Sequence, residues 1–369
     1  MVSRSTLTRP RDLVAAGLLD RERLPELMEV AERYALALTP DIVEGIHPAD
    51  KQDPIARQFI PAKAELETAT EERTDPIGDE RHSPIPGIVH RYPDRVLLTP
   101  VYVCAAYCRF CFRREVVGQK SALSAAQLTV ALTYIREHEQ IWEVILSGGD
   151  PLVLSPRRIA QITQALAAFT HVKVIRVHTR VPVAAPALIS RVLVGALKSA
   201  GKATYVVLHA NHAKELTPKV RMACARLIDA GMPMLSQTVL LRGVNDDAKA
   251  LGELMRALVE CRIKPYYLHH PDLARGTAHW RSDIARGQAL VRGLRGRLSG
   301  LCQPTYVLDI PGGHGKSPIG PHYIRQVNGR AEYEIEDYEG RRHIYPPRAD
   351  SSSPAQRSGA GGGDRPKRA

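Results

Sequence analysis

Three cysteines lie close together in the segment VCAAYCRFCFRR, namely Cys104, Cys108 and Cys111. This CxxxCxxC spacing uses half of the six cysteines of the chain. Three thiolates on one short loop can bind three irons of a [4Fe–4S] cluster and leave the fourth iron open to an exchangeable ligand. A zinc site is the main alternative, but structural zinc takes four protein ligands, and no fourth cysteine or suitably spaced histidine lies nearby in the sequence. The spacing therefore favours an open iron–sulfur reaction centre.

The cysteine loop resembles the signature of radical S-adenosylmethionine (SAM) enzymes. In that superfamily the open iron binds the amino and carboxylate groups of SAM, and reduction of the cluster splits SAM to give a 5′-deoxyadenosyl radical. The later segment Ser147-Gly148-Gly149-Asp150 resembles the SAM-binding motif of the same enzymes, with Asp150 paired to the methionyl ammonium. Without that resemblance, an aspartate after two glycines is as often a turn.

A lysine follows a glycine-rich turn in DIPGGHGKSPIGP, at Lys316. A phosphate-binding loop is excluded, because Ile310 stands where that motif needs glycine and Pro318 opposes the helix that must follow. The Lys316 amine can instead serve as a nucleophile toward an aldehyde cofactor such as pyridoxal phosphate (PLP), although an exposed loop lysine is the more ordinary interpretation. His209 and Gln237 end two predicted strands, and periodicity alone leaves open whether they are functional or core residues.

The elements that must position these residues form an alternating pattern from residue 96 onward, which predicts an α/β fold, a partial (β/α)6 barrel. The predicted strands are 96–103, 143–149, 172–179, 203–210, 234–241 and 264–270, and the predicted helices are 124–138, 155–169, 185–200, 217–231, 248–262 and 284–299. Active sites of βα barrels lie at the carboxyl ends of the strands. The cysteine loop and the other polar segments follow strand ends, so we expect one shared rim.

Length and composition predict one catalytic domain with two flanking segments. Of 369 residues, 44% are apolar, enough for a large core. We expect a mainly helical extension over 1–85 that serves in packing or subunit contact, a radical SAM barrel domain with a PLP-binding C-terminal segment over 86–346, and a disordered basic tail over 347–369. Outside the cysteine loop, Cys224, Cys261 and Cys302 are expected to be buried packing residues.

The net charge of +12 raises the question of a nucleic-acid partner. Part of this charge falls in the Ser/Gly/Pro-rich tail, and the rest is scattered without the aromatic-interleaved basic patch of RNA-binding modules. We therefore do not expect nucleic acid as a partner. No run of eighteen apolar residues and no hydrophobic leader is found, which predicts a cytoplasmic protein without a membrane partner.

The chain resembles the lysine 2,3-aminomutase family, the PLP-dependent branch of radical SAM enzymes, over about residues 36 to 346. The segments that carry the resemblance are SPIPGIVHRYPDRVLL, CAAYCRFCFRR, LSGGDPL, LHANH, SQTVLLRGVND, KPYYLHHPDL and DIPGGHGKSP. The resemblance implies a [4Fe–4S] cluster on the three cysteines and SAM contacts from Ser147, Gly148, Gly149, Asp150, His209 and Gln237. It also implies PLP on Lys316, with further contacts from Arg91, Tyr92 and Arg95.

The resemblance further implies the substrate. Arg113 matches the arginine that binds the substrate carboxylate, and Asp272 and Asp309 match two acids that bind a distal ammonium. Related glutamate 2,3-aminomutases lack these acids, so both together favour L-lysine, whose α-amino group would move to the β-carbon to give β-lysine. An electron donor such as flavodoxin or ferredoxin and a homo-oligomeric state are implied as well.

Two departures leave alternatives open. The clostridial-type enzymes carry extra cysteines for an intersubunit zinc, whereas this chain has Asp247 at one of those positions and no cysteine after Cys302, so we predict no zinc. The segment LHHPDLARGTAHWR also resembles the branch that makes β-lysine for elongation factor P, although the PGG turn before Lys316 favours free-lysine isomerisation. An aminomutase for another amino acid, a radical SAM enzyme acting on RNA or protein without PLP, and a non-catalytic iron–sulfur module are the remaining hypotheses.

Overall fold

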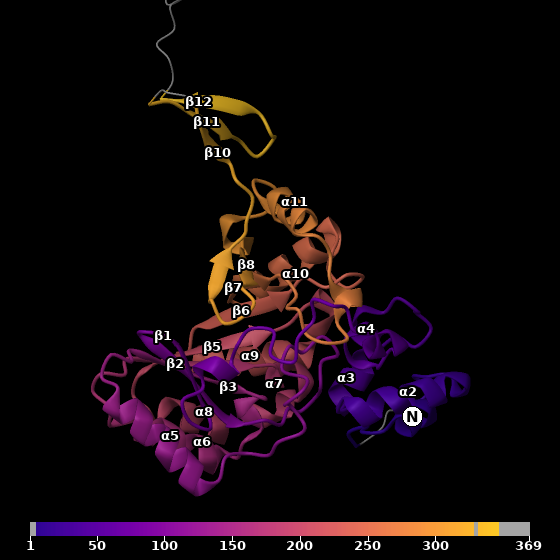
Figure 1. Cartoon of the computed structure of the whole chain (residues 1–369), viewed down its shortest axis with the longest axis vertical. Coiled ribbons are helices and arrows are strands. Elements are labelled where there is room, and N and C mark those ends of the chain that lie inside the picture. Colours follow the sequence, from indigo (N-terminus) through magenta and orange to yellow (C-terminus); the bar gives the residue numbers. More distant parts are fainter. Residues whose placement is uncertain (1–4, 328–330, 347–369) are drawn as a thin grey trace, which may run out of the picture. The chain divides into compact units, whose positions relative to one another are not determined.

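The computed structural model describes residues 5–327 and 331–346 (Figure 1). The chain divides into two compact units, residues 1–321 and residues 322–369. The predicted basic tail, 347–369, lies outside the described residues. In the described ranges no helix has the length and apolar character needed to span a membrane.

The first unit begins with four short helices, α1 (Pro10–Ala15), α2 (Leu24–Arg33), α3 (Pro40–Gly45) and α4 (Pro54–Phe59). Each has a proline in its first turn, where the missing N–H costs no helical hydrogen bond. Leu13, Leu27 and Phe59 are fully buried and belong to the same apolar cluster as Val96 and Leu98 of the sheet. The N-terminal helices therefore pack onto the core of the sheet, with α2, α3 and α4 grouped at one side of it (Figure 1).

A curled nine-stranded sheet forms the centre of the first unit, in the strand order β1 to β9. Seven neighbouring strands run parallel: β2 (Arg95–Val101), β3 (Glu143–Gly148), β4 (Val174–Thr179), β5 (Ala203–His209), β6 (Met234–Val239), β7 (Ile263–His269) and β8 (Thr305–Asp309). The edge strands β1 (Ile88–Tyr92) and β9 (Lys316–Pro318) run antiparallel to their neighbours. The partial barrel is confirmed, and each of the six predicted strands is present as one of β2 to β7.

The two edges of the sheet approach each other. Tyr92 on β1 accepts a hydrogen bond through its hydroxyl from the backbone N–H of Lys316 on β9, at 2.8 Å. A Cβ atom on Gly315 would lie 2.9 Å from the same hydroxyl, and Gly315 has a φ of +90°, so a side chain there would be both strained and crowded. This contact brings the predicted cofactor lysine to the opening of the curled sheet.

Helices connect the parallel strands close to the predicted ranges: α5 (Ala125–Glu137), α6 (Pro156–Ala167), α9 (Pro218–Asp229), α10 (Ala248–Glu260) and α11 (Ile284–Leu294). Ser124, Ser155 and Thr217 cap their helices by accepting backbone N–H groups. The prediction of one helix over 185–200 was wrong. After α7 (Val181–Ala184), that region contains a 3₁₀ turn at Pro186–Leu188 and then a separate helix, α8 (Arg191–Lys198). The new helix begins after Ser190 because the Ser190 hydroxyl accepts a hydrogen bond from the backbone N–H of Leu193.

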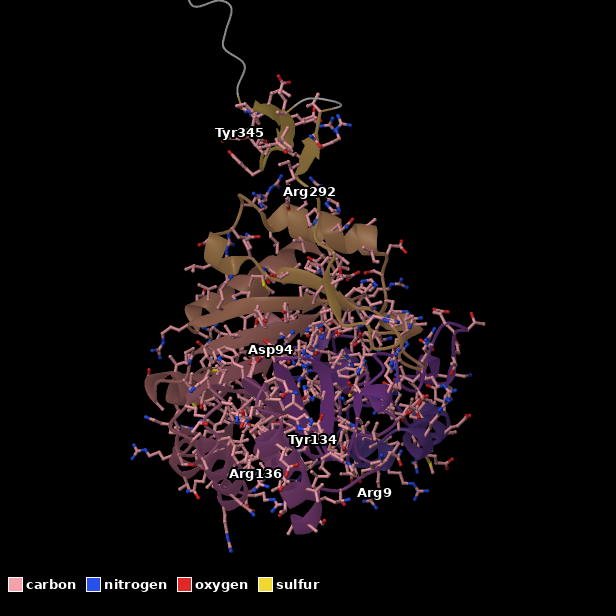
Figure 2. The ribbon with its side chains drawn as sticks, turned by 60° about the vertical axis from the view of Figure 1, so that its left-hand side comes forward. Arg9, Asp94, Tyr134, Arg136, Arg292 and Tyr345 are labelled. Atoms are coloured by element: carbon pink, nitrogen blue, oxygen red, sulfur yellow. The ribbon has the colours of Figure 1, made fainter. Side chains whose placement is uncertain are left out.

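Two expectations from the sequence concern the burial of the remaining cysteines and the scatter of the basic charge. Cys224 and Cys302 are buried as predicted, whereas Cys261 is only partly buried, at the end of α10. The basic side chains Arg9, Arg136 and Arg292 lie apart, beside α1, on α5 and on α11 (Figure 2).

The second unit contains a three-stranded antiparallel sheet, β10 (Ile324–Gln326), β11 (Tyr333–Glu336) and β12 (Arg342–Tyr345), which the sequence analysis did not predict.

Candidate active site

One cavity of about 710 Å³ collects every residue that the sequence analysis assigned to a site. Its walls include the three cysteines, the Ser147–Asp150 segment, both predicted PLP arginines and Lys316. The remaining assigned residues on the wall are Tyr92, Arg113, His209, Gln237, Asp272 and Asp309. Residues separated by more than two hundred positions therefore face the same space.

The cysteine loop follows β2 and is tied to the N-terminal helices. The backbone N–H of Tyr107 donates to Ala37 O and that of Arg109 donates to Gln58 O. Arg109 and Arg114, beside the cluster cysteines, share the fully buried carboxylate of Glu65, with Arg109 Nη2 at 2.6 Å. This buried cluster of charges fixes the backbone of the loop.

Burial makes the thiolate form of the three cysteines depend on a bound cation. Burial raises the pKa of each, and that of Cys111 to about 11. Ionised thiolates in this setting need a strongly positive partner, which iron supplies, because burial disfavours an unpaired charge. The donor set of three cysteines is that of an open [4Fe–4S] site.

The Ser147-Gly148-Gly149-Asp150 segment supports the start of the cysteine loop. A Cβ atom on Gly149 would lie 2.4 Å from Val103 O, so the two backbones approach more closely than any side chain allows. Asp150 accepts hydrogen bonds from Thr179 Oγ1 at 2.8 Å and from the backbone N–H of Arg180 at 2.6 Å. Burial raises the pKa of Asp150, and these hydrogen bonds lower it in part. The predicted contact of this segment with SAM stays a prediction.

His209 ends β5, whereas Gln237 lies within β6, two residues before that strand ends at Val239, and the two residues are opposite each other in register. Burial lowers the pKa of His209 well below its ordinary value, so the ring is neutral near pH 7. His209 Nε2 is buried and has no hydrogen-bond partner in the described part of the chain. A buried nitrogen without a partner is suited to bind a ligand in the cavity.

Lys316 opens β9, opposite Asp309 at the end of β8. Its Nζ donates to both carboxylate oxygens of Asp309, at 2.7 and 2.5 Å. Burial raises the pKa of Asp309, but the nearby His269 ring, 3.6 Å away, and the Lys316 ammonium outweigh it and hold the pKa well below its ordinary value. Asp309 is therefore an ionised carboxylate that already binds an alkylammonium group.

Asp272 is the second acid of this end of the cavity. Burial, followed by the negative charge of Asp309, raises the pKa of Asp272 to about 7. Its Oδ1 is buried and has no hydrogen-bond partner among residues 5–327 and 331–346. In this pair, the charge of Asp309 is balanced by the Lys316 ammonium, and Asp272 has unused hydrogen-bonding capacity.

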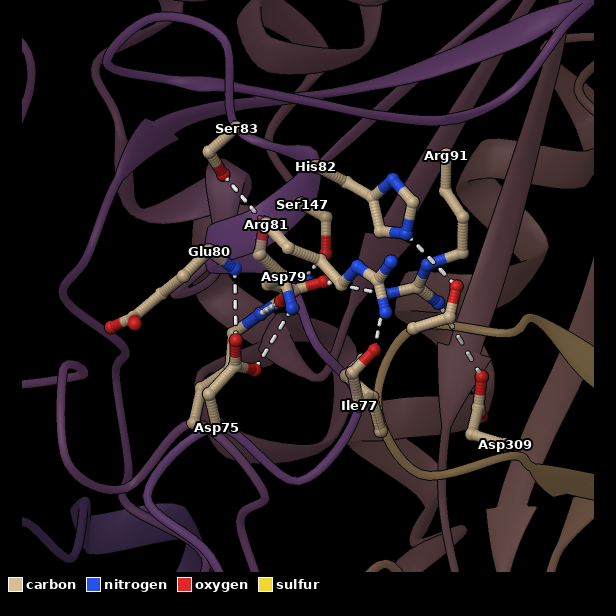
Figure 3. Close-up of polar contacts among 12 residues, drawn as sticks. Asp75, Ile77, Asp79, Glu80, Arg81, His82, Ser83, Arg91, Ser147 and Asp309 are labelled. Atoms are coloured by element: carbon tan, nitrogen blue, oxygen red, sulfur yellow. Dashed lines mark hydrogen bonds and ion pairs between the residues drawn. The ribbon is translucent and has the colours of Figure 1, made fainter.

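Asp79, which the sequence analysis missed, connects two of the predicted site arginines, Arg91 and Arg113. Its contact with Arg91 is drawn in Figure 3. Its carboxylate lies 3.1 Å from Arg91 Nη2 and 2.8 Å from Arg113 Nε. The same segment also binds the turn before Lys316, because Arg81 Nη1 donates to Gly312 O and His82 Nε2 lies 2.9 Å from Gly313 O. The cluster of charges in DPIGDERH could have indicated a role in the site, but this segment belongs to the extension for which the sequence predicts packing or subunit contact.

Arg95 occupies a different part of the wall, at the start of β2 instead of its end. Its guanidinium lies 3.9 Å above the Tyr92 ring and 2.7 Å from Asp94. A stacked and partly exposed guanidinium can contact an anionic or planar group at the open side of the sheet. A PLP contact of Arg95 stays a prediction.

Arg180, directly after β4, is the second residue that the sequence analysis missed. Its Nη1 donates to Cys108 Sγ at 3.1 Å, and its Nη2 bonds Glu215. Arg180 is buried and lines the cavity. The signal was its position, because polar residues directly after parallel strands meet at the same rim.

A curled parallel sheet whose first parallel strand leads into a three-cysteine loop, with that loop facing the cavity, defines a radical SAM enzyme. The sequence matches the Radical SAM superfamily over residues 98–255 and the Lysine-2,3-aminomutase family over residues 291–357. The chain is 39% identical over 307 residues to L-lysine 2,3-aminomutase of Clostridium subterminale, covering 83% of this chain and 74% of that one. It is 41% identical over 294 residues to the Acetoanaerobium sticklandii enzyme of the same name, covering 79% and 71%.

A glutamate 2,3-aminomutase of Clostridioides difficile is also similar, at 36% identity over 307 residues, covering 83% of this chain and 72% of that one. The chain belongs to the lysine 2,3-aminomutase family of radical SAM enzymes. It is an isomerase of the aminomutase type, and membership of the superfamily brings a [4Fe–4S] cluster and SAM. The predicted family and enzyme class are thus confirmed.

Proposed function

We propose that the chain is a PLP-dependent aminomutase that moves the α-amino group of L-lysine to the β-carbon and yields β-lysine. The observation that carries the substrate is the ion pair of Asp309 with the Lys316 ammonium, at 2.5 to 2.7 Å. In this ion pair, a lysine side chain of the protein itself binds a carboxylate that lines the cavity. A free lysine brings the same alkylammonium group.

Asp272 strengthens the case for a cationic substrate. Its Oδ1, which has no partner within the described residues, and the ionised Asp309 carboxylate form an acidic end of the cavity that an ammonium neutralises. In the resting enzyme with PLP bound, the Lys316 nitrogen would be joined to PLP and would not be a free ammonium for Asp309. The distal carboxylate of glutamate would face two acids there, and like charges in a buried site repel strongly.

Arg113 supports the binding of the substrate carboxylate. Asp79 engages the Nε and Nη2 edge of its guanidinium, at 2.8 Å for each contact. Within the described residues, the contacts of the Nη1 atom are long, 3.3 Å to Ser147 Oγ and 3.5 Å to Gly148 O. This nitrogen retains hydrogen-bonding capacity for a carboxylate, while Asp79 keeps the planar group oriented.

The cofactor sites are supported by buried polar atoms on the cavity wall that lack partners within the described residues: Arg91 Nε, Arg180 Nε, His178 Nε2 and His209 Nε2. A bound ligand or an ordered water would satisfy such atoms. We assign Arg91, Tyr92, Arg95 and Lys316 to PLP, and Ser147 to Asp150, His209 and Gln237 to SAM. When bound, PLP supplies an aldehyde for amines and a π system that stabilises an adjacent radical, while the cluster and SAM supply that radical.

The chain's own residues then have distinct tasks. Lys316 provides the amine that anchors PLP, and Tyr92 fixes the Lys316 backbone through the 2.8 Å hydrogen bond. Arg113 and the two acids hold the opposite ends of the substrate, which orients its α- and β-carbons within the cavity. The neutral ring of His209 offers a hydrogen bond without adding charge.

The test is a substrate panel with purified, reconstituted enzyme under anaerobic conditions, with SAM, PLP and a reductant. We expect β-lysine from L-lysine and no β-amino acid from L-glutamate or L-norleucine. Asp309→Asn should reduce kcat/KM for lysine strongly, whereas Asp283→Asn, an exposed acid outside the cavity, should not change it. Turnover of glutamate in preference to lysine would overturn the substrate assignment.

PLP itself is tested by absorbance. The wild-type protein should show the band of PLP bound to a lysine, and Lys316→Ala should lack it, while the cluster absorbance is retained. A low-potential electron donor such as flavodoxin or ferredoxin, a homo-oligomeric assembly and a cytoplasmic location complete the proposal. The alternative is that the product serves to modify elongation factor P. Cells fed with labelled lysine would then carry labelled β-lysine on that factor.

A further inference from the structure

A hydrogen bond to a cluster cysteine comes from the arginine that follows β4. Arg180 Nη1 lies 3.1 Å from Cys108 Sγ, and the Arg180 side chain is only 8% exposed. Arginine stays protonated at every accessible pH, so this contact brings a permanent positive charge to the sulfur. The sulfur is one of the three cluster ligands.

The surrounding residues hold the guanidinium in place. The Arg180 backbone N–H donates to Asp150 Oδ2 at 2.6 Å, which joins Arg180 to the SGGD segment. Its Nη2 donates to Gln58 Oε1 at 2.7 Å and to Glu215 Oε2 at 2.5 Å, and its Cζ lies 4.7 Å from the Phe59 ring centre. A guanidinium fixed on three sides is a preorganised donor, not a mobile surface charge.

Reduction adds one electron to the cluster and therefore makes it more negative. Hydrogen bonds to cluster sulfurs and nearby charges set the potential at which this happens. The guanidinium favours the reduced state, and the Glu215 carboxylate, at 2.5 Å from Nη2, counteracts it. Arg180 Nε is also buried and has no hydrogen-bond partner among residues 5–327 and 331–346.

We propose that Arg180 is a positioning residue that raises the reduction potential of the [4Fe–4S] cluster through its hydrogen bond to Cys108, and that Glu215 limits this effect. The electron comes from an external one-electron donor, such as dithionite or a flavodoxin-type protein. The inference rests on the cluster that the superfamily brings and is independent of the amino-acid substrate proposed above.

The test is a redox titration of the reconstituted holoprotein, followed by electron paramagnetic resonance of the reduced cluster. Arg180→Met removes the charge and the donor, so the reduction equilibrium constant should fall at least about tenfold, which is about 59 mV for a one-electron couple. Arg180→Lys keeps the charge but not the planar donor, and should give a smaller decrease. Glu215→Gln removes the opposing charge and should raise the potential.

Opposite signs separate this role from structural damage, which has no reason to shift the potential upward in Glu215→Gln. Iron and sulfide content and circular dichroism establish that each variant is assembled. If Arg180→Met does not fold, the reduction potentials of Arg180→Lys and Glu215→Gln, which should shift in opposite directions, still test the proposal. Unchanged potentials in assembled Arg180 variants, or shifts of the same sign in Arg180→Lys and Glu215→Gln, would overturn the proposal.

Discussion

Lysine binding should depend on pH between about 5 and 7, because Asp272 has to be ionised to receive the ammonium. Burial, and then the charge of Asp309, raises the pKa of Asp272 to about 7, against the smaller opposing effects of Lys316 and Arg113. Below that pH the carboxyl group is protonated in the free enzyme. An ammonium beside it favours the ionised form, so binding releases a proton.

The magnitude follows from linkage. Above pH 7 Asp272 is already ionised and the affinity for lysine should be constant with respect to this group. Well below pH 7 each pH unit costs about 1.36 kcal/mol, or tenfold in affinity, and because Asp272 is half ionised at pH 7, lysine should bind roughly fiftyfold more weakly at pH 5 than at pH 7. Norleucine has the same chain without the ammonium and shares every other titration in the cavity, so it corrects for Lys316, Asp309 and the cofactor.

The assay is isothermal titration calorimetry of the holoenzyme with both ligands, in buffers of different ionisation enthalpy. Lysine binding at pH 6 should release close to one more proton than norleucine binding, and Asp272→Asn should abolish that difference. An equal pH slope for the two ligands, or a lysine slope that Asp272→Asn leaves intact, would refute the role of Asp272.

Three further variants test the support of the site. Glu65→Gln leaves two buried guanidiniums without their shared carboxylate and should destabilise the protein by about 3 to 5 kcal/mol, measured by denaturant unfolding; a loss below about 1 kcal/mol would contradict the anchoring role. Asp79→Asn keeps the shape but loosens Arg113, and steady-state kinetics should show a KM for lysine raised about tenfold, with kcat much less affected, as expected for a charge-assisted hydrogen bond; a changed kcat with an unchanged KM would speak against it. Gly149→Ala should place a Cβ atom 2.4 Å from Val103 O, so we expect low iron content after reconstitution, and full cluster occupancy would show that the loop tolerates the side chain.

The barrel could be predicted because strands and helices of ordinary length carry a clear period. Each connection from β2 to β7 has a helix of eight residues or more, and strands buried on both faces, such as β3, appear as continuous apolar runs. Edge strands such as β9, of three residues, are too short to show a period, and β8 lies between Pro304 and Pro311, so its strand character was hidden. The break at Ser190 was missed because its cap lies inside an otherwise apolar run.

The cysteine loop, the SGGD segment and His209 could be placed on one wall because polar residues after parallel strands meet at one rim, whereas the PLP and substrate residues came from the family resemblance. The contacts among them could not. Lys316 and Asp309 are seven positions apart and paired across a hairpin, and nothing local says that the ammonium binds that acid. Asp79 and Arg180 act through partners 34 and 72 positions away, which only the folded chain brings together.

The central claim is that the iron–sulfur centre and the lysine-bound PLP act on one substrate in one cavity. Incubation of the reduced holoenzyme with SAM and L-lysine deuterated at the β-carbon measures this directly. We predict that deuterium from lysine appears in the adenosyl methylene of SAM or in 5′-deoxyadenosine, together with β-lysine, and that both signals are lost in Lys316→Ala. Deoxyadenosine without deuterium, formed equally well by Lys316→Ala, would contradict the account.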